Sequence, residues 1–256
     1  GKRMAGQNKQ AAKASRVRLF VDMPIAAGVE LPLESAQSHY LGTVMRLAPG
    51  DTLFIFNGRD GEWRAAIATL RRGAGTLLPE AQEKPQRAAN GPWLLFAPVK
   101  SSRTELLIEK ASELGAAELW PVMTQYCQSK RVKPERYRAH AIEAAEQCGR
   151  LEVPEIQPLA ALSAVLEAWP ADRRLMFCDE SGGPPALEAL AAAPPAPWAI
   201  LVGPEGGFST AERAEIKSRP YCVPVSLGPR TLRAETAAVA ALSLWQAVLG
   251  DLRSGN

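Results

Sequence analysis

The chain has 256 residues, of which 46% are hydrophobic and 22% are charged, and its formal net charge is +3 at pH 7. This length is enough to bury one large core or two small ones, and the fractions are ordinary for a globular protein. No apolar run approaches the roughly 20 residues that cross a membrane, and the basic N-terminus lacks the apolar stretch of a secretory signal. We therefore expect no membrane partner and a cytoplasmic location.

Cysteine and histidine usage argues against a metal site. The four cysteines are far apart and form no Cys-x-x-Cys pair, and neither His39 nor His140 stands beside a cysteine or an acid at metal-ligand spacing. We expect reduced, buried thiols, no bound metal and no Ser-His-Asp triad.

The first third of the chain predicts a small β-rich domain. Residues 1–15 are basic and aperiodic, and we expect a flexible tail there. The next domain is expected over residues 16–82, and a polar linker over 83–92, within an aperiodic stretch from Pro79 to Pro92. Its predicted elements are strands at Val17–Val21, Thr52–Phe56 and Trp63–Leu70, a hairpin turn at Asn57–Gly61 and a short helix at Ser38–Leu47.

From Trp93 the pattern changes to alternating strands and helices, which predicts a parallel sheet with helices on both faces. We place this second domain at residues 93–252. Its expected strands are Trp93–Val99, Glu118–Met123, Arg174–Asp179, Trp198–Val202 and Tyr221–Leu227. Its expected helices are Thr104–Leu114, Pro134–Gly149, Pro184–Ala193, Thr210–Ser218 and one that begins at Glu235 and closes at Gly250.

Gly203-Pro204-Glu205-Gly206-Gly207 follows a buried apolar strand and precedes a helix capped by Ser209 and Glu212. The glycines allow a ligand to approach the backbone closely. No Gly-Lys-Ser/Thr follows them, so the loop lacks the groups that hold a nucleotide's phosphates and its magnesium. An adenosine-like ligand without phosphates suits this turn better.

A second turn, Leu227-Gly228-Pro229-Arg230-Thr231-Leu232-Arg233, lies between the next strand and the last helix. Glu235 near the helix start is ordinary dipole chemistry, but Arg230 and Arg233 oppose the dipole. Two cations there favour an anionic partner.

At these residues the chain resembles the RsmE family of RNA methyltransferases, in the SPOUT superfamily. The resemblance spans roughly residues 16–252. Besides the two turns, it rests on an N-terminal match at residues 39–51, Ile108–Gly115 with its Glu-Lys-Ala-Ser-Glu-Leu-Gly run, and the segment from Glu143 through Arg150 to Ile156.

The resemblance implies a fold and an activity. The fold would be α/β, with a trefoil-knotted parallel sheet domain preceded by a PUA-like β-barrel that binds RNA. The activity would be methylation of N3 of a uridine in 16S ribosomal RNA of the small subunit, with S-adenosylmethionine as cofactor. The family's dimeric arrangement, together with the alanine-rich helix Ala237–Leu249, predicts a homodimer.

The resemblance also assigns the cofactor to the ends of three strands and their turns, at Phe177, Cys178, Leu201, Val202, Gly203, Gly207, Leu227, Gly228 and Leu232. RNA contacts are expected from basic residues. Arg16, Lys130 and Arg131 belong to two basic clusters, Arg46 to the N-terminal match, and Lys100 and Arg150 follow a strand end and a helix end.

Methylation of uracil N3 requires its proton to leave, and the resulting anion spreads onto O2 and O4. An arginine aimed at those oxygens would stabilise it as an oxyanion hole does. Arg233 is the first candidate and Arg230 the alternative. Glu205 or Glu235 could accept the proton, although carboxylates are weak bases unless burial raises their pKa.

Two other functions are consistent with the sequence. One is an RNA 2′-O-methyltransferase of the same superfamily, which is disfavoured because Leu232-Arg233-Ala234-Glu235 stands where those enzymes carry an Asn-rich helix start. The other is a non-catalytic RNA-binding assembly factor, which is disfavoured by the intact pair of glycine turns.

Overall fold

The structure is a computed structural model that describes residues 12–254, so the expected tail falls largely outside the described residues. The chain divides into two compact units, residues 1–87 and 88–256. This division falls within the linker expected at residues 83–92. Among the described residues, no helix is both long and apolar enough to cross a membrane.

The N-terminal unit is built on one five-stranded sheet in the order β1-β3-β4-β5-β2. The β1–β3 pair is parallel and the other pairs are antiparallel. Its elements are β1 (Ala14–Phe20), β2 (Leu31–Leu33), α1 (Ser35–His39), the π-helical turn η1 (Tyr40–Val44), β3 (Thr52–Phe56), β4 (Glu62–Arg71) and β5 (Ala74–Lys84).

Three predictions for this unit need correction. The tail expected over residues 1–15 ends earlier, because β1 already begins at Ala14. Residues 79–84 were read as the start of an aperiodic stretch, but they complete β5, whose partner β4 pairs with it as far as Lys84. The polar residues indicated a linker, but one face of this hairpin is exposed, so polar residues also occur within the strand. The single helix predicted at Ser38–Leu47 is instead the short α1 followed by η1; α1 begins three residues earlier, at Ser35, and η1 ends at Val44.

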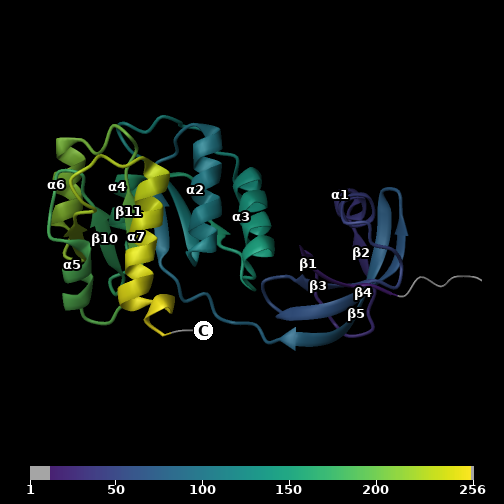
Figure 1. The fold of residues 1–256 in the computed structure, drawn as a ribbon. Helices are drawn as coiled ribbons and strands as arrows, with labels where there is room; N and C mark the ends of the chain where they lie inside the picture. The colour runs from purple at the N-terminus through teal and green to yellow at the C-terminus, as the bar shows by residue number, and fades with distance from the viewer. Residues whose placement is uncertain (1–11, 255–256) are drawn as a thin grey trace, which may run out of the picture. The chain divides into compact units, whose positions relative to one another are not determined.

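The C-terminal unit contains a parallel sheet in the order β12-β10-β11-β6-β7-β8, with β9 paired to β7 (Figure 1). Its strands are β6 (Trp93–Phe96), β7 (Glu118–Met123), β8 (Glu155–Ile156), β9 (Ala160–Ala161), β10 (Arg174–Cys178), β11 (Trp198–Val202) and β12 (Cys222–Val225). Every strand pair is parallel, as the alternating pattern predicted. The predicted α/β class is therefore confirmed, while the knot stays a prediction.

Helices cover both faces of this sheet. The helices are α2 (Ser101–Glu113), α3 (Pro134–Cys148), α4 (Leu162–Glu167), α5 (Ala186–Ala192), α6 (Thr210–Ser218), α7 (Ala234–Leu249) and the 3-10 turn η2 (Asp251–Arg253). Helices α2, α3, α5 and α7 share one apolar core with the sheet, and α4 and α6 contribute to the core on the other face. The segment between α3 and β10, for which no element was predicted, holds β8, β9 and α4.

Helix α7 packs its small residues inside the protomer. Ala238 and Ala241 are fully buried in the core that α7 shares with α2 and α5. This alanine face, offered above as a reason to expect a dimer, is thus already covered within one chain.

Candidate active site

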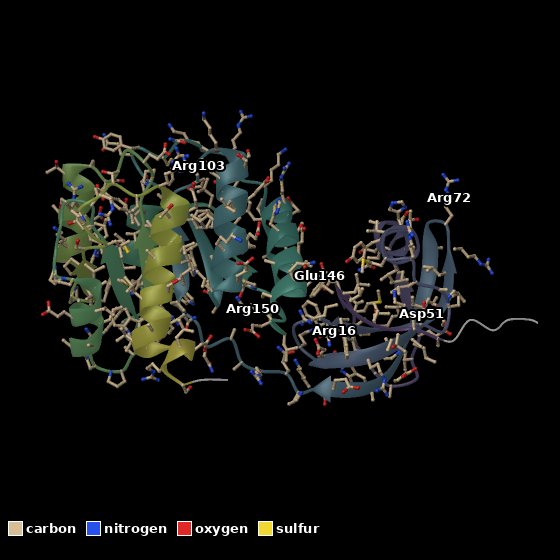
Figure 2. The ribbon with its side chains drawn as sticks, in the orientation of Figure 1. Arg16, Asp51, Arg72, Arg103, Glu146 and Arg150 are labelled. Carbon is tan, nitrogen blue, oxygen red and sulfur yellow. The ribbon has the colours of Figure 1, made fainter. Side chains whose placement is uncertain are left out.

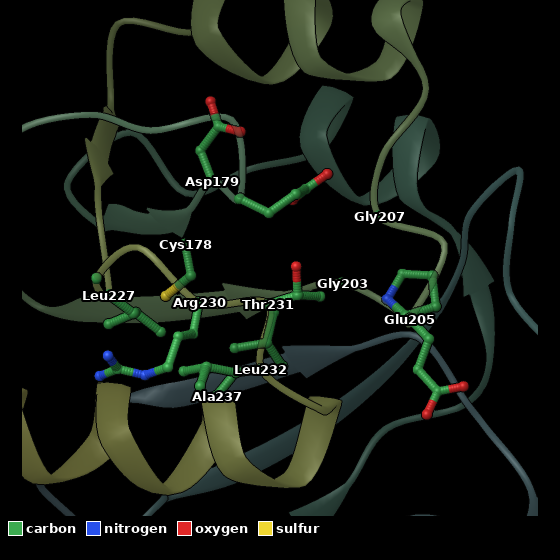
Figure 3. A pocket seen from close by; sticks show the side chains of 14 residues that line it. Cys178, Asp179, Gly203, Glu205, Gly207, Leu227, Arg230, Thr231, Leu232 and Ala237 are labelled. Atoms are coloured by element: carbon green, nitrogen blue, oxygen red, sulfur yellow. The ribbon is translucent and has the colours of Figure 1, made fainter.

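A pocket opens at the carboxyl edge of the parallel sheet, where β10, β11 and β12 end (Figure 3). In a parallel sheet, ligands usually bind beyond the carboxyl ends of the strands, because the loops there converge. The lining residues come from the three loops and from α7. They are Cys178, Asp179, Glu180, Val202, Gly203, Pro204, Glu205, Gly207, Leu227, Gly228, Arg230, Thr231, Leu232 and Ala237.

The first glycine turn is closely packed on its inner side. A Cβ atom on Gly203 would lie 2.7 Å from the ring of Phe208, which is buried in the core. Gly207 has φ +69, and a Cβ atom there would overlap the carboxylate of Glu180. These two positions therefore require glycine. The capping box predicted at Ser209 and Glu212 is present and begins α6.

Asp179 and Glu180, which follow β10 directly, hold this turn in place. Glu180 accepts a hydrogen bond from the backbone N–H of Phe208 at 3.0 Å and pairs with Arg213 at 2.6 Å. Asp179 pairs with Arg213 at 3.0 Å and with Lys217 at 2.6 Å. Burial alone would raise the pKa of Asp179, but hydrogen bonds from Lys217 and Ser181 outweigh it and hold that pKa below its ordinary value.

The second turn is open toward the pocket. Gly228 has φ +106, and an added Cβ atom would meet no heavy atom within 4 Å. Its N–H donates to the Ser226 hydroxyl at 3.1 Å. A side chain at this position would thus be strained, and it would occupy space that the pocket now leaves free.

The four predicted catalytic residues lie at this edge of the sheet. Arg230 and Glu205 line the pocket, and Figure 3 shows Glu205 on the side away from Cys178 and Leu227. Arg233 is exposed at the N-cap of α7, and Glu235 lies in the first turn of that helix. Neither of these two residues lines the pocket.

Arg103, a residue that the sequence analysis missed, joins the two predicted carboxylates. Its guanidinium binds Glu235 through Nε at 3.1 Å and Nη2 at 2.8 Å, and it contacts Glu205 through Nη1. The hydrogen bond from Arg103 lowers the pKa of Glu235. A hydrogen bond from Gln128, supported by Arg103, lowers the pKa of Glu205. Both carboxylates are therefore weaker proton acceptors than free glutamate.

Two predicted cofactor residues face the wrong side of the sheet. Successive side chains of a strand alternate between faces. Phe177 and Leu201 pack into the core beneath α4 and α6, whereas Cys178 and Val202 line the pocket on the α7 side. The other predicted cofactor residues, Gly203, Gly207, Leu227, Gly228 and Leu232, are brought together as expected.

The predicted RNA contacts are dispersed. Lys100 is exposed at the N-cap of α2, and Lys130 and Arg131 are exposed in the loop after β7. Arg16 and Arg46 are exposed in the N-terminal unit. Arg46 has φ +54, a left-handed conformation at the end of η1 where glycine is more usual.

Arg150 was expected near the pocket, but it lies at the opposite edge of the sheet, after the C-terminus of α3 (Figure 2). Its Nη1 donates to the carbonyl oxygens of Ser112 and Ala116 at 2.8 and 2.9 Å. Its side chain is only 9% exposed, and it also pairs with Glu152. This arginine stabilises the fold and does not contribute to the pocket.

Within residues 12–254, no three His, Cys, Asp or Glu side chains are arranged to hold a metal ion. Cys178 lines the pocket as a thiol, and burial raises its pKa to about 12. The described site thus offers backbone groups, arginines and paired carboxylates.

Comparisons with known proteins agree with this arrangement. A family model for an RNA methyltransferase domain matches residues 89–246, and one for an RNA methyltransferase PUA domain matches residues 33–78. Ribosomal RNA small subunit methyltransferase E of Rickettsia conorii is 31% identical over 229 residues, which cover 88% of this chain and 93% of that protein.

Solved structures share the fold. A methyltransferase from Legionella pneumophila, in complex with the cofactor SAM, has a TM-score of 0.80 and 30% identity over 91% of this chain and 98% of its own. The methyltransferase E of Neisseria gonorrhoeae has a TM-score of 0.81 at 23% identity and covers 91% of this chain and 98% of its own. The chain therefore belongs to the RsmE family of ribosomal RNA small subunit methyltransferases, with a PUA domain in its N-terminal part.

Proposed function

We propose that this protein methylates N3 of a uridine in 16S ribosomal RNA, with S-adenosylmethionine bound in the pocket at the ends of β10, β11 and β12. The proposal depends on the two glycine turns, which line one pocket, and on the chain's membership in the RsmE family. The Legionella pneumophila relative, whose structure contains SAM, supports the choice of cofactor.

The pocket suits that cofactor on its own chemistry. The backbone of Val202 and Gly203, and that of Leu227 and Gly228, lines it without an intervening side chain at either glycine. A flat adenosine group would fit the free space before Gly228, where an added Cβ atom has no neighbour. Phosphate would be poorly placed, because Asp179, Glu180 and Glu205 line the same pocket.

When bound, S-adenosylmethionine supplies an electrophilic methyl group. The protein's contribution is to orient the uracil and to stabilise the anion that remains when the N3 proton leaves to solvent water. Arg233 and Arg230 stand at the second turn, and either guanidinium can donate to O2 or O4 of that anion. Glu205 and Glu235 are poor candidates for the base, because hydrogen bonds from Gln128 and Arg103 stabilise their ionised forms.

RNA would approach along the carboxyl edge of the sheet, where Lys100, Lys130 and Arg131 are exposed. Contacts of this kind neutralise phosphates without reading sequence. Arg16 and Arg46 are proposed contacts of the PUA domain. We also propose a homodimer that acts in the cytoplasm, on the strength of the resemblance. Light scattering that showed a monomer at micromolar concentration would contradict the dimer.

The decisive experiment is methyl transfer to small-subunit RNA from a strain that lacks this protein, followed by nucleoside analysis. We expect new 3-methyluridine at one site, and no further methyl transfer to RNA of the parent strain, which is already modified. A 2′-O-methylated nucleoside would indicate the related activity. RNA binding without any methylated product, under conditions where the cofactor binds, would indicate a non-catalytic assembly factor.

A further inference from the structure

A single guanidinium connects the two loops that form the pocket. Glu205 belongs to the turn after β11, and Glu235 to the start of α7 after the second turn. Arg103, in the first turn of α2, contacts both glutamates. Glu205 lies 102 residues later in the sequence and Glu235 lies 132 residues later. Besides the packing of α2 on α7, this contact joins the turn after β11 to the start of α7.

The base of Arg103 is rigid. Its neighbour Thr104 is 1% exposed, and the Thr104 hydroxyl both accepts from the N–H of Val99 at 3.0 Å and donates to its carbonyl at 3.1 Å. Helix α2 also packs along α7 in the shared core. The guanidinium therefore extends from a fixed backbone, so the contact restrains the positions of the two loops.

The contact with Glu235 has the geometry of a strong pair. Two nitrogens of Arg103 meet two oxygens of Glu235, and both side chains are largely buried, at 18% and 13% exposure. Paired, planar hydrogen bonds of this kind fix orientation as well as charge, which a lysine ammonium cannot do. Gln128 donates to the remaining oxygen of Glu205 at 2.9 Å and so completes the arrangement.

We propose that Arg103 is a positioning residue for methyl transfer, which holds the Gly203–Gly207 turn and the start of α7 at the separation that aligns cofactor and uracil. This proposal rests on the function proposed above. It assigns Glu205 and Glu235 to the same task, as the two acceptors of one clamp. In this proposal the clamp positions the two loops and takes no part in proton transfer.

The clamp makes a specific kinetic prediction. Arg103→Gln should lower kcat at saturating RNA and cofactor at least about tenfold, because small misplacements of reacting groups cost this much or more. Arg103→Lys should not restore it. Glu205→Gln and Glu235→Gln should each lower kcat less, since each breaks one arm, and their losses should not add to that of Arg103→Gln.

The pH profile separates the clamp from a carboxylate base. If the glutamates only position the loops, Glu205→Gln and Glu235→Gln keep the wild-type dependence of kcat on pH. Lys110→Gln is the matched control, because Lys110 is a cation on the same helix that pairs with Glu109 and Glu113 at the surface. We expect wild-type kcat for this control.

Hydrogen exchange gives a readout that needs no activity. In Arg103→Gln, amides of residues 203–207 and 227–237 should exchange at least about fivefold faster than in the wild type, and in Lys110→Gln they should not. Additive kcat losses, wild-type kcat in Arg103→Gln, a changed pH profile in either glutamine variant, or unchanged exchange would each overturn the clamp. A wild-type protein without methyl-transfer activity would refute the proposed function, whereas the exchange result would still decide whether Arg103 fixes the loops.

Discussion

The two edges of the parallel sheet use arginine in opposite ways. At the carboxyl edge, Arg103 holds carboxylates of two loops, and Arg230 and Arg233 stay exposed. At the amino edge, Arg150 donates to the carbonyls of Ser112 and Ala116, and Arg173 donates to the carbonyl of Trp198 at 2.8 Å. At the carboxyl edge, Arg103 therefore binds carboxylates, whereas the arginines of the amino edge donate to backbone carbonyls.

Aromatic packing strengthens this contrast. The guanidinium of Arg173 lies 3.7 Å from the ring centre of Trp93, which stacks on Trp120. Such contacts stabilise a cation against the face of an aromatic ring. The direction of the strands also separates the two edges, because the loops that leave the carboxyl ends converge on a common space.

The largest effect is expected from a pair of glycines, one at each edge. Gly228 has φ +106 and Gly149 has φ +86, and an added Cβ atom meets nothing within 4 Å at either. Valine should strain both backbones alike, by about 1–3 kcal/mol. Gly228 lines the pocket and Gly149 does not, so for Gly228→Val calorimetry should show at least about a hundredfold loss of cofactor affinity, equivalent to roughly 2.7 kcal/mol.

Gly149→Val is the control for backbone strain, and it should lose stability without losing cofactor affinity. Equal losses of affinity in the two variants would mean that strain alone explains the effect. Gly203→Val is a less clean test of the pocket, because its side chain would displace the buried ring of Phe208.

The next effect concerns the rate of methyl transfer. Arg233→Ala should lower the single-turnover rate at saturating RNA on the order of a hundredfold, as for the loss of one oxyanion donor, with cofactor affinity little changed. Arg230→Ala is the paired variant, because Arg230 lines the pocket and Arg233 does not. A near wild-type rate at saturation, with weaker RNA binding and a smaller salt dependence, would make Arg233 a phosphate contact.

At the amino edge we expect a loss of stability instead of rate. Arg150→Met removes the charged donor from the carbonyls of Ser112 and Ala116, of which Ser112 keeps the N–H of Gly115, and we expect the fold to lose about 2 kcal/mol. Denaturant unfolding measures this loss. The methylation rate, measured at denaturant concentrations well below the unfolding transition, should stay at the wild-type value. A selective loss of RNA affinity would instead indicate that Arg150 contacts RNA.

Sequence patterns predicted β6, β7, β10, β11 and β12, because buried parallel strands are mostly apolar runs, as at Trp198–Val202, but they missed the two-residue strands β8 and β9. They also located the pocket, since two glycine turns after such strands meet at one edge. The same patterns could not say which face each strand residue takes, so Phe177 and Leu201 were included with Cys178 and Val202.

Contacts between distant segments were beyond those patterns. Nothing near Arg103 indicates that it pairs with a glutamate 132 residues later. Arg150 was placed at the wrong edge because it follows a helix end, and the pattern does not show that α3 ends at the amino edge of the sheet. Asp179 and Glu180 did carry a signal, since Asp179 ends the predicted strand Arg174–Asp179 and a second acid follows it directly.

The smallest expected effect is a difference in pH dependence between the two edges. Arg103 stabilises the ionised form of Glu235, whose pKa lies below its ordinary value of 4.5. Stability from this pair is therefore present above that value and is lost as the pH falls through the depressed pKa. The difference in Tm between wild type and Arg103→Gln should be constant from pH 8 to pH 6, both well above 4.5, and should shrink below pH 4.5.

Arg150 donates to carbonyl oxygens, which do not titrate, so most of the loss of stability caused by Arg150→Met should persist at low pH. Thermal unfolding of both variants across this range tests the contrast, and a parallel acid dependence in the two would show that the edges do not differ in this way.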